Sequence, residues 1–400
     1  MQIMLHWVLV VFLVASNVQA KKHEDPECSM TTLQIIEHWG YPAEIHTVTT
    51  QDGYILELHR IPYGRNDAKP TAPRPVVFMQ HGLECSSSNW ITNLPEESAG
   101  FMFADAGFDV WLGNMRGNTY STKHVSLNPK HDKFWQWTWD EMAKYDLEAM
   151  IDMALTTTEQ QHLYYIGHSQ GTLTMFSKLS MDQAFSDKIR KFFALAPVGS
   201  VAHIRGMLKF LADDFSLELD VYYDMFGAGK FLPNNIIMKM IADSVCGGLK
   251  VEAELCDNIL FLIAGPESHQ MNATRTPVYL SHTPADTSSM NIMHWLQMVK
   301  RGTVAMYDYG TKENKKKYGQ AEPPEYDFTK IQNPIYVYSG DEDWLADPND
   351  VSGYLMPRIS HTVVQNTELH DYNHLDFIWG LRAAADIYTP IINIIKQDLS

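Results

Sequence analysis

The sequence predicts an α/β fold with a mostly parallel central sheet and one large helical insertion. A β-rich hairpin comes first, at residues 44–61, with its turn at 51–53. Short β-branched or aromatic runs then alternate with helical patterns, which is typical of a parallel sheet covered on both faces. The alternation stops at 200–328, where amphipathic helical patterns follow one another. We therefore expect two core parts, 21–199 and 329–400, on either side of this insertion.

The expected core elements follow the chain in a regular order. The clearest helix is expected at 145–155, where Leu147, Met150, Ile151 and Ala154 recur at helical spacing. A polar, Pro-containing stretch at 310–328 is expected to be a solvated connector. After the hairpin, strands are expected at 76–80, 109–112, 163–166, 192–196, 335–338 and 362–364.

The N-terminus has the pattern of a signal peptide at residues 1–20. Its apolar run, 5–14, is too short to span a membrane, and Val18 and Ala20 stand at the −3 and −1 positions of a cleavage site. No later segment has about 18 uninterrupted apolar residues, so no transmembrane segment is expected in the mature chain. Entry into the secretory pathway makes Asn272, in Asn-Ala-Thr, a candidate glycosylation site.

Composition and cysteine usage exclude several function classes. The formal net charge of −17, with no basic block longer than 315–317, argues against a nucleic-acid partner. No metal-binding spacing is present, and no cofactor is expected. In an oxidising pathway the proximity of Cys246 and Cys256 favours a local disulfide, whereas the pairing of Cys28 and Cys85 stays open.

The stretch Gly167-His168-Ser169-Gln170-Gly171 matches Gly-x-Ser-x-Gly, the pattern of a nucleophilic serine on a tight strand-to-helix turn. The glycines are required because side chains would clash in so tight a turn. A bare match of this kind is weak, since an ordinary glycine-bounded loop has the same letters. An apolar strand pattern before it and an amphipathic helix pattern after it favour the nucleophile, Ser169.

A nucleophilic serine needs a base and an acid, which in this arrangement follow it in the order acid, then base. The acidic loop after the strand at 335–338 offers Asp341, Asp343 and Asp347, and spacing alone does not choose between them. Of the later histidines, His374 precedes an apolar helical run and is the expected base. His370 lies in a charged stretch and is expected to be a surface residue.

Ester hydrolysis also needs two donors for the oxyanion of the reaction. The residue after the nucleophile, Gln170, supplies one backbone N–H. The loop after the strand at 76–80 supplies the other, and the order His81-Gly82-Leu83 makes Leu83 the expected donor. The alternative for this segment is a plain strand-to-helix loop with Gly82 as its turn residue.

Taken together, the segments QHGL, SSNW, ADAGFDVWLGNMRGN, DEMAKYDLEAMID, YIGHSQGT, FFALAPV, LSHTPADTSSMNIMHW, YDYG, LADPNDV and YNHLDFIWG resemble the acid lipase family of α/β-hydrolases. This resemblance implies an α/β-hydrolase fold in which 200–328 is a cap, part of it a lid over an apolar tunnel. It implies Ser169 as nucleophile, His374 as general base and acid, Asp343 as the residue that orients His374, and Leu83 and Gln170 as the oxyanion donors.

The expected function is hydrolysis of long-chain carboxylic esters, triacylglycerols or steryl esters, through an acyl-enzyme intermediate. The partners are then a lipid ester and a lipid–water interface, and the resemblance implies acidic pH and a secreted or lysosomal location. A soluble carboxylesterase or phospholipase with the same three residues is the first alternative. A non-catalytic lipid-binding protein is the second, and the intact set of Ser169, Asp343 and His374 argues against it. The sequence leaves the preferred ester and the oligomeric state open.

Overall fold

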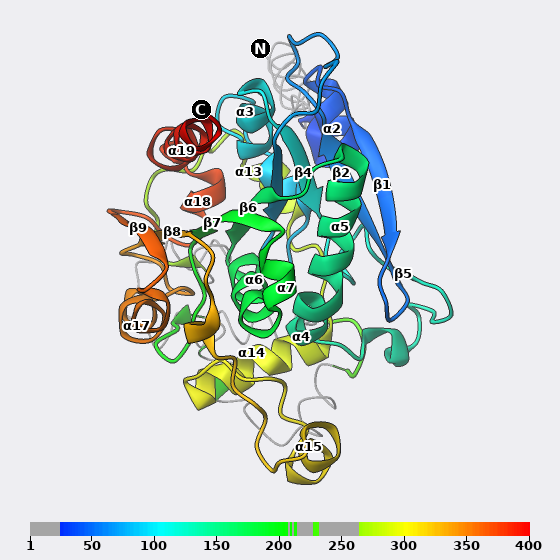
Figure 1. The fold of residues 1–400 in the computed structure, drawn as a ribbon, viewed down its shortest axis with the longest axis vertical. Coiled ribbons are helices and arrows are strands. Elements are labelled where there is room, and N and C mark those ends of the chain that lie inside the picture. Colours follow the sequence, from blue (N-terminus) through cyan, green and yellow to red (C-terminus); the bar gives the residue numbers. More distant parts are fainter. Residues whose placement is uncertain (1–24, 207–208, 210–211, 214–226, 232–263) are drawn as a thin grey trace, which may run out of the picture.

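A large mixed sheet with helices packed around it forms the centre of the computed structural model (Figure 1). The structure describes residues 25–206, 209, 212–213, 227–231 and 264–400. Within these residues the strands are β1 (Glu44–Thr49), β2 (Tyr54–Ile61), β3 (Val76–Gln80), β4 (Asp109–Gly113), β5 (Lys123–His124), β6 (Leu163–His168), β7 (Ile189–Leu195), β8 (Ile335–Gly340) and β9 (Val363–Leu369).

The strand order is β1-β2-β4-β3-β6-β7-β8-β9, with β5 paired to β2. The predicted hairpin forms β1 and β2, which pair antiparallel, and β2 also runs antiparallel to β4. From β4 through β3 and β6 to β9 every pairing is parallel. The prediction of a mostly parallel α/β sheet is therefore confirmed. The carboxyl ends of the parallel strands all lie at one edge, where ligand sites of such sheets form.

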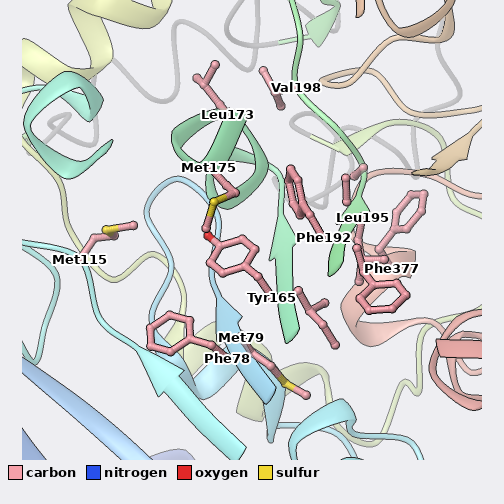
Figure 2. Packing of buried hydrophobic residues seen from close by; sticks show 14 of the residues in the cluster. Phe78, Met79, Met115, Tyr165, Leu173, Met175, Phe192, Leu195, Val198 and Phe377 are labelled. Atoms are coloured by element: carbon pink, nitrogen blue, oxygen red, sulfur yellow. The ribbon is translucent and has the colours of Figure 1, made fainter. Parts of the chain in front are cut away.

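The inner strands are apolar because both of their faces are covered. Every residue of β3, β4, β6 and β8 is buried, whereas β1 alternates between half-buried and exposed positions. Figure 2 shows Phe78 of β3, Tyr165 of β6 and Phe192 of β7 packed together under the neighbouring helix. The Tyr165 ring lies 6.0 Å from that of Phe78 and 5.5 Å from that of Phe192. This core supports β6, the strand that ends directly before Ser169.

Helices fill the connections between strands. The predicted helix at 145–155 appears as α5, two residues later at its start and three at its end. The described α-helices are α2 (Thr32–His38), α3 (Ala99–Asp105), α4 (Trp139–Glu141), α5 (Leu147–Thr158), α6 (Gln170–Met181), α7 (Gln183–Ser186), α13 (Thr276–His282), α14 (Ser289–Arg301), α15 (Thr311–Tyr318), α16 (Pro348–Asp350), α17 (Met356–Ile359), α18 (Asp376–Trp379) and α19 (Thr389–Leu399).

Two expectations about local structure need correction. The last strand is longer than predicted, since β9 continues to Leu369 through Gln365 and Asn366. β9 is an edge strand, and these polar side chains are exposed. This part of the strand therefore has no apolar run from which it could be predicted. The predicted connector at 310–328 contains α15, a short exposed helix that ends at Gly319 in a left-handed conformation. Figure 1 shows α15 at the end of the molecule opposite the C-terminus.

Several predicted features lie outside the described residues. These are the signal peptide at 1–20, most of the amphipathic pattern at 203–226, and both Cys246 and Cys256 with their expected disulfide. Among the residues that the structure describes, no helix is long and apolar enough to cross a membrane.

Candidate active site

The turn between β6 and α6 holds Ser169 in a strained backbone conformation. Its φ is 54° and its ψ is −120°, a combination that residues with a side chain rarely adopt. Such strain costs about 1–3 kcal/mol and persists only where surrounding contacts impose it. Here the Ser169 carbonyl accepts hydrogen bonds from the N–H of Thr172 (2.8 Å) and its hydroxyl (2.6 Å), and the Ser169 N–H donates to Leu195 O (3.1 Å). The Ser169 carbonyl also accepts from the N–H of Leu173 (3.3 Å), so four hydrogen bonds fix the turn.

Glycines surround Ser169 because no side chain fits at their positions. A Cβ on Gly171 would lie 2.4 Å from the carbonyl oxygen of Gln80, and one on Gly167 would lie 2.8 Å from that of Gly171. A Cβ on Gly82 would lie 3.0 Å from the Cβ of Ser169. The first two distances are shorter than real Cβ contacts. Gly171 is therefore required by the close approach of α6 to the end of β3, and Gly167 by the tight turn between β6 and α6. The Gly82 loop also lies directly against Ser169.

Asp343 and His374 meet beyond the carboxyl ends of β8 and β9. The Nδ1–H of His374 donates to Asp343 Oδ2 (2.9 Å) and Oδ1 (3.0 Å), and the two side chains are 3% and 0% exposed. The N–H groups of Leu345 and Ala346 each donate to Asp343 Oδ1 at 2.8 Å. These bonds orient the carboxylate. With the proton on Nδ1, the Nε2 atom of His374 is left as an acceptor.

The other acids of the loop have different partners. Asp341 pairs with His370, whose side chain is 83% exposed, in agreement with the expected surface position of that histidine. Asp347 is buried, forms an ion pair with Arg205 (3.1 Å) and accepts from the N–H of Asn349 (2.9 Å). Of the three acids that spacing left open, only Asp343 contacts His374.

His168, the residue before Ser169, packs against His374. Its Nε2–H donates to the carbonyl oxygen of His374 (2.9 Å), and the two rings lie 4.9 Å apart. Burial, with a smaller effect of His374, lowers the pKa of His168 to about 3. His168 is therefore neutral across the acidic range and adds no second positive charge beside His374. No local sequence pattern predicts this contact, because it joins residues 206 positions apart.

The loop after β3 brings Leu83 next to the turn that holds Ser169. Its geometry is held by His81, whose Nδ1–H donates to the carbonyl of Gly82 (2.8 Å) and whose Nε2 accepts from the N–H of Met115 (3.2 Å). Burial lowers the pKa of His81 to about 4, so this ring is also neutral over most of the acidic range. Leu83 itself is half-buried against the core. Gln170 is the first residue of α6, where a backbone N–H has no partner within its own helix.

Glu84, which follows Leu83, has a positive φ of 53°. Burial and the nearby charge of Asp286 raise the pKa of Glu84 to about 7. Asp286 forms an ion pair with Lys230 (2.7 Å). The side chain beside the predicted oxyanion donor is therefore protonated at acidic pH.

A contact that sequence reasoning missed joins the acid and base loops. The carbonyl oxygen of Ala264 accepts hydrogen bonds from the N–H of Trp344 (3.2 Å) and from that of His374 (3.1 Å). At the next residue, Gly265, φ is +126° and a Cβ would lie 2.3 Å from the carbonyl oxygen of Glu342. The returning end of the predicted insertion thus packs closely between the loops of Asp343 and His374.

The remaining candidate sites can be placed more briefly. Asn272 is half-buried, and its Oδ1 accepts from the hydroxyl (2.7 Å) and N–H (3.2 Å) of Thr274. Cys85 is a buried free thiol, so the structure contains no Cys28–Cys85 disulfide. In the part of the chain that the structure describes, no group of three His, Cys, Asp or Glu side chains could hold a metal ion.

Comparisons with known proteins identify the family of the chain. The family model "alpha/beta hydrolase fold" matches residues 75–381, and "Partial alpha/beta-hydrolase lipase region" matches 32–94. Lipase lipl-1 of Caenorhabditis elegans is 63% identical over 395 residues, 98% of each chain. Human gastric triacylglycerol lipase and human lysosomal acid lipase/cholesteryl ester hydrolase are each 44% identical over 374 residues, 93% of this chain and 92% of theirs.

A solved structure supports the fold independently. The crystal structure of a putative lipase from Sulfolobus solfataricus superposes with a TM-score of 0.58 at 13% identity, covering 89% of this chain and 94% of that one. At so low an identity the likeness concerns the fold alone, and it is the α/β-hydrolase fold that the sequence predicted. With relatives this similar along nearly their whole length, the chain belongs to the acid lipase family of α/β-hydrolases.

Proposed function

We propose that this protein is a lipase that hydrolyses carboxylic esters of long-chain fatty acids, triacylglycerols or steryl esters, at acidic pH. The observation that carries the proposal is the buried His374–Asp343 pair at the strand ends, which packs against His168, the residue before the strained Ser169. Relatives named gastric triacylglycerol lipase and lysosomal acid lipase/cholesteryl ester hydrolase support the two substrate classes. They also support a secreted or lysosomal location for this chain.

In the acylation step, Nε2 of His374 takes the proton of the Ser169 hydroxyl as its oxygen attacks the ester carbonyl carbon. Asp343 holds the imidazole through Nδ1 and stabilises the positive charge that the ring then carries. His374 gives the proton to the leaving alcohol, and the acyl group remains on Ser169. In the second half, water attacks the acyl-enzyme with the same proton transfers and releases the fatty acid.

The backbone N–H groups of Leu83 and Gln170 are the proposed donors to the oxyanion formed in both steps. Such donors stabilise negative charge without reorganising, and the loss of one typically lowers kcat about 10²- to 10³-fold. The Gln170 N–H lies at the N-terminus of α6, where the helix dipole adds to the effect. Protonated Glu84 leaves no negative charge beside Leu83 at acidic pH.

The region 200–328 is the proposed cap, part of which acts as a lid over an apolar acyl site. The family resemblance supports this assignment, as do the cap's described contacts with the active-site loops through Ala264. Closure over the substrate would exclude water from Ser169 and would respond to a lipid–water interface.

The proposal is tested by measuring fatty-acid release from triolein and cholesteryl oleate between pH 4 and 8. Release should be greatest in the acidic half of this range and absent in Ser169→Ala. Comparison with a short-chain ester and a phospholipid separates a lipase from the carboxylesterase and phospholipase alternatives. No release from any of these substrates at any pH, with lipid still bound by the protein, would contradict the proposal.

A further inference from the structure

The side chain of Gln170 is held by two donors from helix α14. Its Oε1 accepts hydrogen bonds from Asn291 Nδ2 (3.0 Å) and from Trp295 Nε1 (2.8 Å). The two donors are four residues apart, so they project from the same face of α14. All three side chains are buried, at 3%, 0% and 2% exposure. The predicted oxyanion residue of the core is thus joined directly to a helix of the proposed cap.

The two donors are themselves fixed in place. Asn291 Nδ2 also donates to the hydroxyl of Thr287 (3.1 Å), one turn earlier. The start of α14 is capped by Ser288, whose hydroxyl oxygen accepts from the N–H of Asn291 (2.9 Å) and whose hydroxyl donates to Trp137 O (2.7 Å). Since Trp137 belongs to the core part of the chain, α14 presents both donors to Gln170 from a defined position.

This arrangement suits a residue whose backbone N–H must stay in a fixed position. The backbone N–H of Gln170 is a proposed oxyanion donor, and the side chain of the same residue is anchored at its far end. None of the three groups titrates between pH 4 and 8, so the anchor is unchanged across the range in which the enzyme would work. A carboxylate at position 170 could accept the same two bonds, but it would place a negative charge beside the oxyanion.

We propose that Asn291 and Trp295 are positioning residues. By holding the side chain of Gln170, they keep its backbone N–H directed at the position of the oxyanion. The proposal rests on the proposed function of Ser169 and Gln170.

The first test removes one donor at a time and measures kcat and KM on a short soluble ester. Trp295→Phe keeps an aromatic ring but removes the N–H, and Asn291→Leu removes the amide. Each should lower kcat about 10- to 100-fold, the loss expected for a misplaced catalytic group, with KM changed less than about threefold.

The matched control is Trp139→Phe. Trp139 is also fully buried, and it stacks on His294 of α14 with ring centroids 4.2 Å apart. Within the described residues its Nε1 has no hydrogen-bond partner, so the substitution removes the same atoms without breaking such a bond. Its kcat should stay within about threefold of the parent. A loss equal to that of Trp295→Phe would show that packing, and not the bond to Gln170, is what matters.

A second variant gives a readout that packing alone would not produce. Asn291→Asp can donate to Gln170 only while its carboxyl is protonated, and burial among neutral groups raises the pKa of such a carboxyl. Its kcat relative to the parent should therefore be close to normal at low pH and fall as pH rises. Thermal unfolding at each pH identifies losses caused by unfolding. The pH dependence of Tm relative to the parent also shows where the introduced carboxyl ionises. A flat kcat ratio in a folded variant, across the pH range in which this carboxyl ionises, would overturn the proposal.

The outcomes separate this proposal from the proposed function. Activity that persists in Ser169→Ala contradicts the proposed function itself. An inactive Ser169→Ala together with parental kcat in Trp295→Phe and Asn291→Leu overturns only the role of α14. If Trp295→Phe does not fold, the pH profile of Asn291→Asp decides.

Discussion

Replacing Ser169 with glycine should stabilise the protein while abolishing ester hydrolysis. The φ of 54° and ψ of −120° at this residue are strained for serine and unstrained for glycine. Relief of the strain contributes about 1–3 kcal/mol, and the extra freedom of glycine in the unfolded chain offsets about 0.4–1 kcal/mol of it. The net gain is about 0.5–2 kcal/mol.

The matched control is Ser169→Ala, which removes the hydroxyl but keeps the strain. An unfolding entropy of about 2.1 cal/mol/K per residue gives about 0.8 kcal/mol/K for 400 residues. The glycine variant should therefore unfold about 0.6–2.5 °C above the alanine variant, measured by calorimetry at one scan rate and pH. Equal or lower Tm in the glycine variant would refute the view that the fold holds Ser169 under strain. Both variants should release no fatty acid.

Three further predictions concern the surroundings of Ser169. Asp343→Asn should lower kcat about 10⁴-fold by removing the acceptor of the His374 proton, whereas Asp341→Asn should leave kcat within about threefold, as steady-state assays would show. Gly171→Ala should cost about 1–3 kcal/mol, seen in denaturant unfolding, because its Cβ would lie 2.4 Å from Gln80 O. Burial and a nearby carboxylate raise the pKa of Glu84 from 4.5 to about 7, so the folded state binds this proton more tightly than the unfolded chain. The contribution of Glu84 to stability is complete below about pH 4.5 and is lost as pH rises to about 7. Glu84→Gln should remove this loss. If the variant shows the same difference in Tm between pH 4.5 and 7.5 as the parent, the raised pKa of Glu84 is contradicted.

Much of the fold could be predicted because its signals are local. The buried strands are short apolar runs, and β3 was predicted residue for residue at 76–80. The turn at Ser169 has a local sequence signature, because no side chain fits at Gly167 or Gly171. The edge strand β9 was underestimated because its exposed polar residues carry no apolar pattern.

The site could be predicted only in part because its contacts join distant segments. Spacing left three acids open in one loop, and the contact of Asp343 with His374 distinguishes it from the other two. The bond of His168 to the His374 carbonyl and the bridging carbonyl of Ala264 involve partners more than 75 residues apart. Contacts of this kind depend on tertiary packing, and no single-sequence pattern encodes them.

The measurement that tests the central claim most directly is covalent trapping of the active serine. A long-chain alkyl phosphonate ester forms a stable adduct with an activated serine and mimics the oxyanion of the acylation step. After incubation at acidic pH and proteolysis, mass spectrometry should find one labelled residue, Ser169, with fatty-acid release lost in proportion to labelling. Trapping should be abolished in Ser169→Ala and strongly slowed in Asp343→Asn. Labelling of another residue, or full activity of a protein quantitatively labelled at Ser169, would contradict the assignment of Ser169 as the nucleophile.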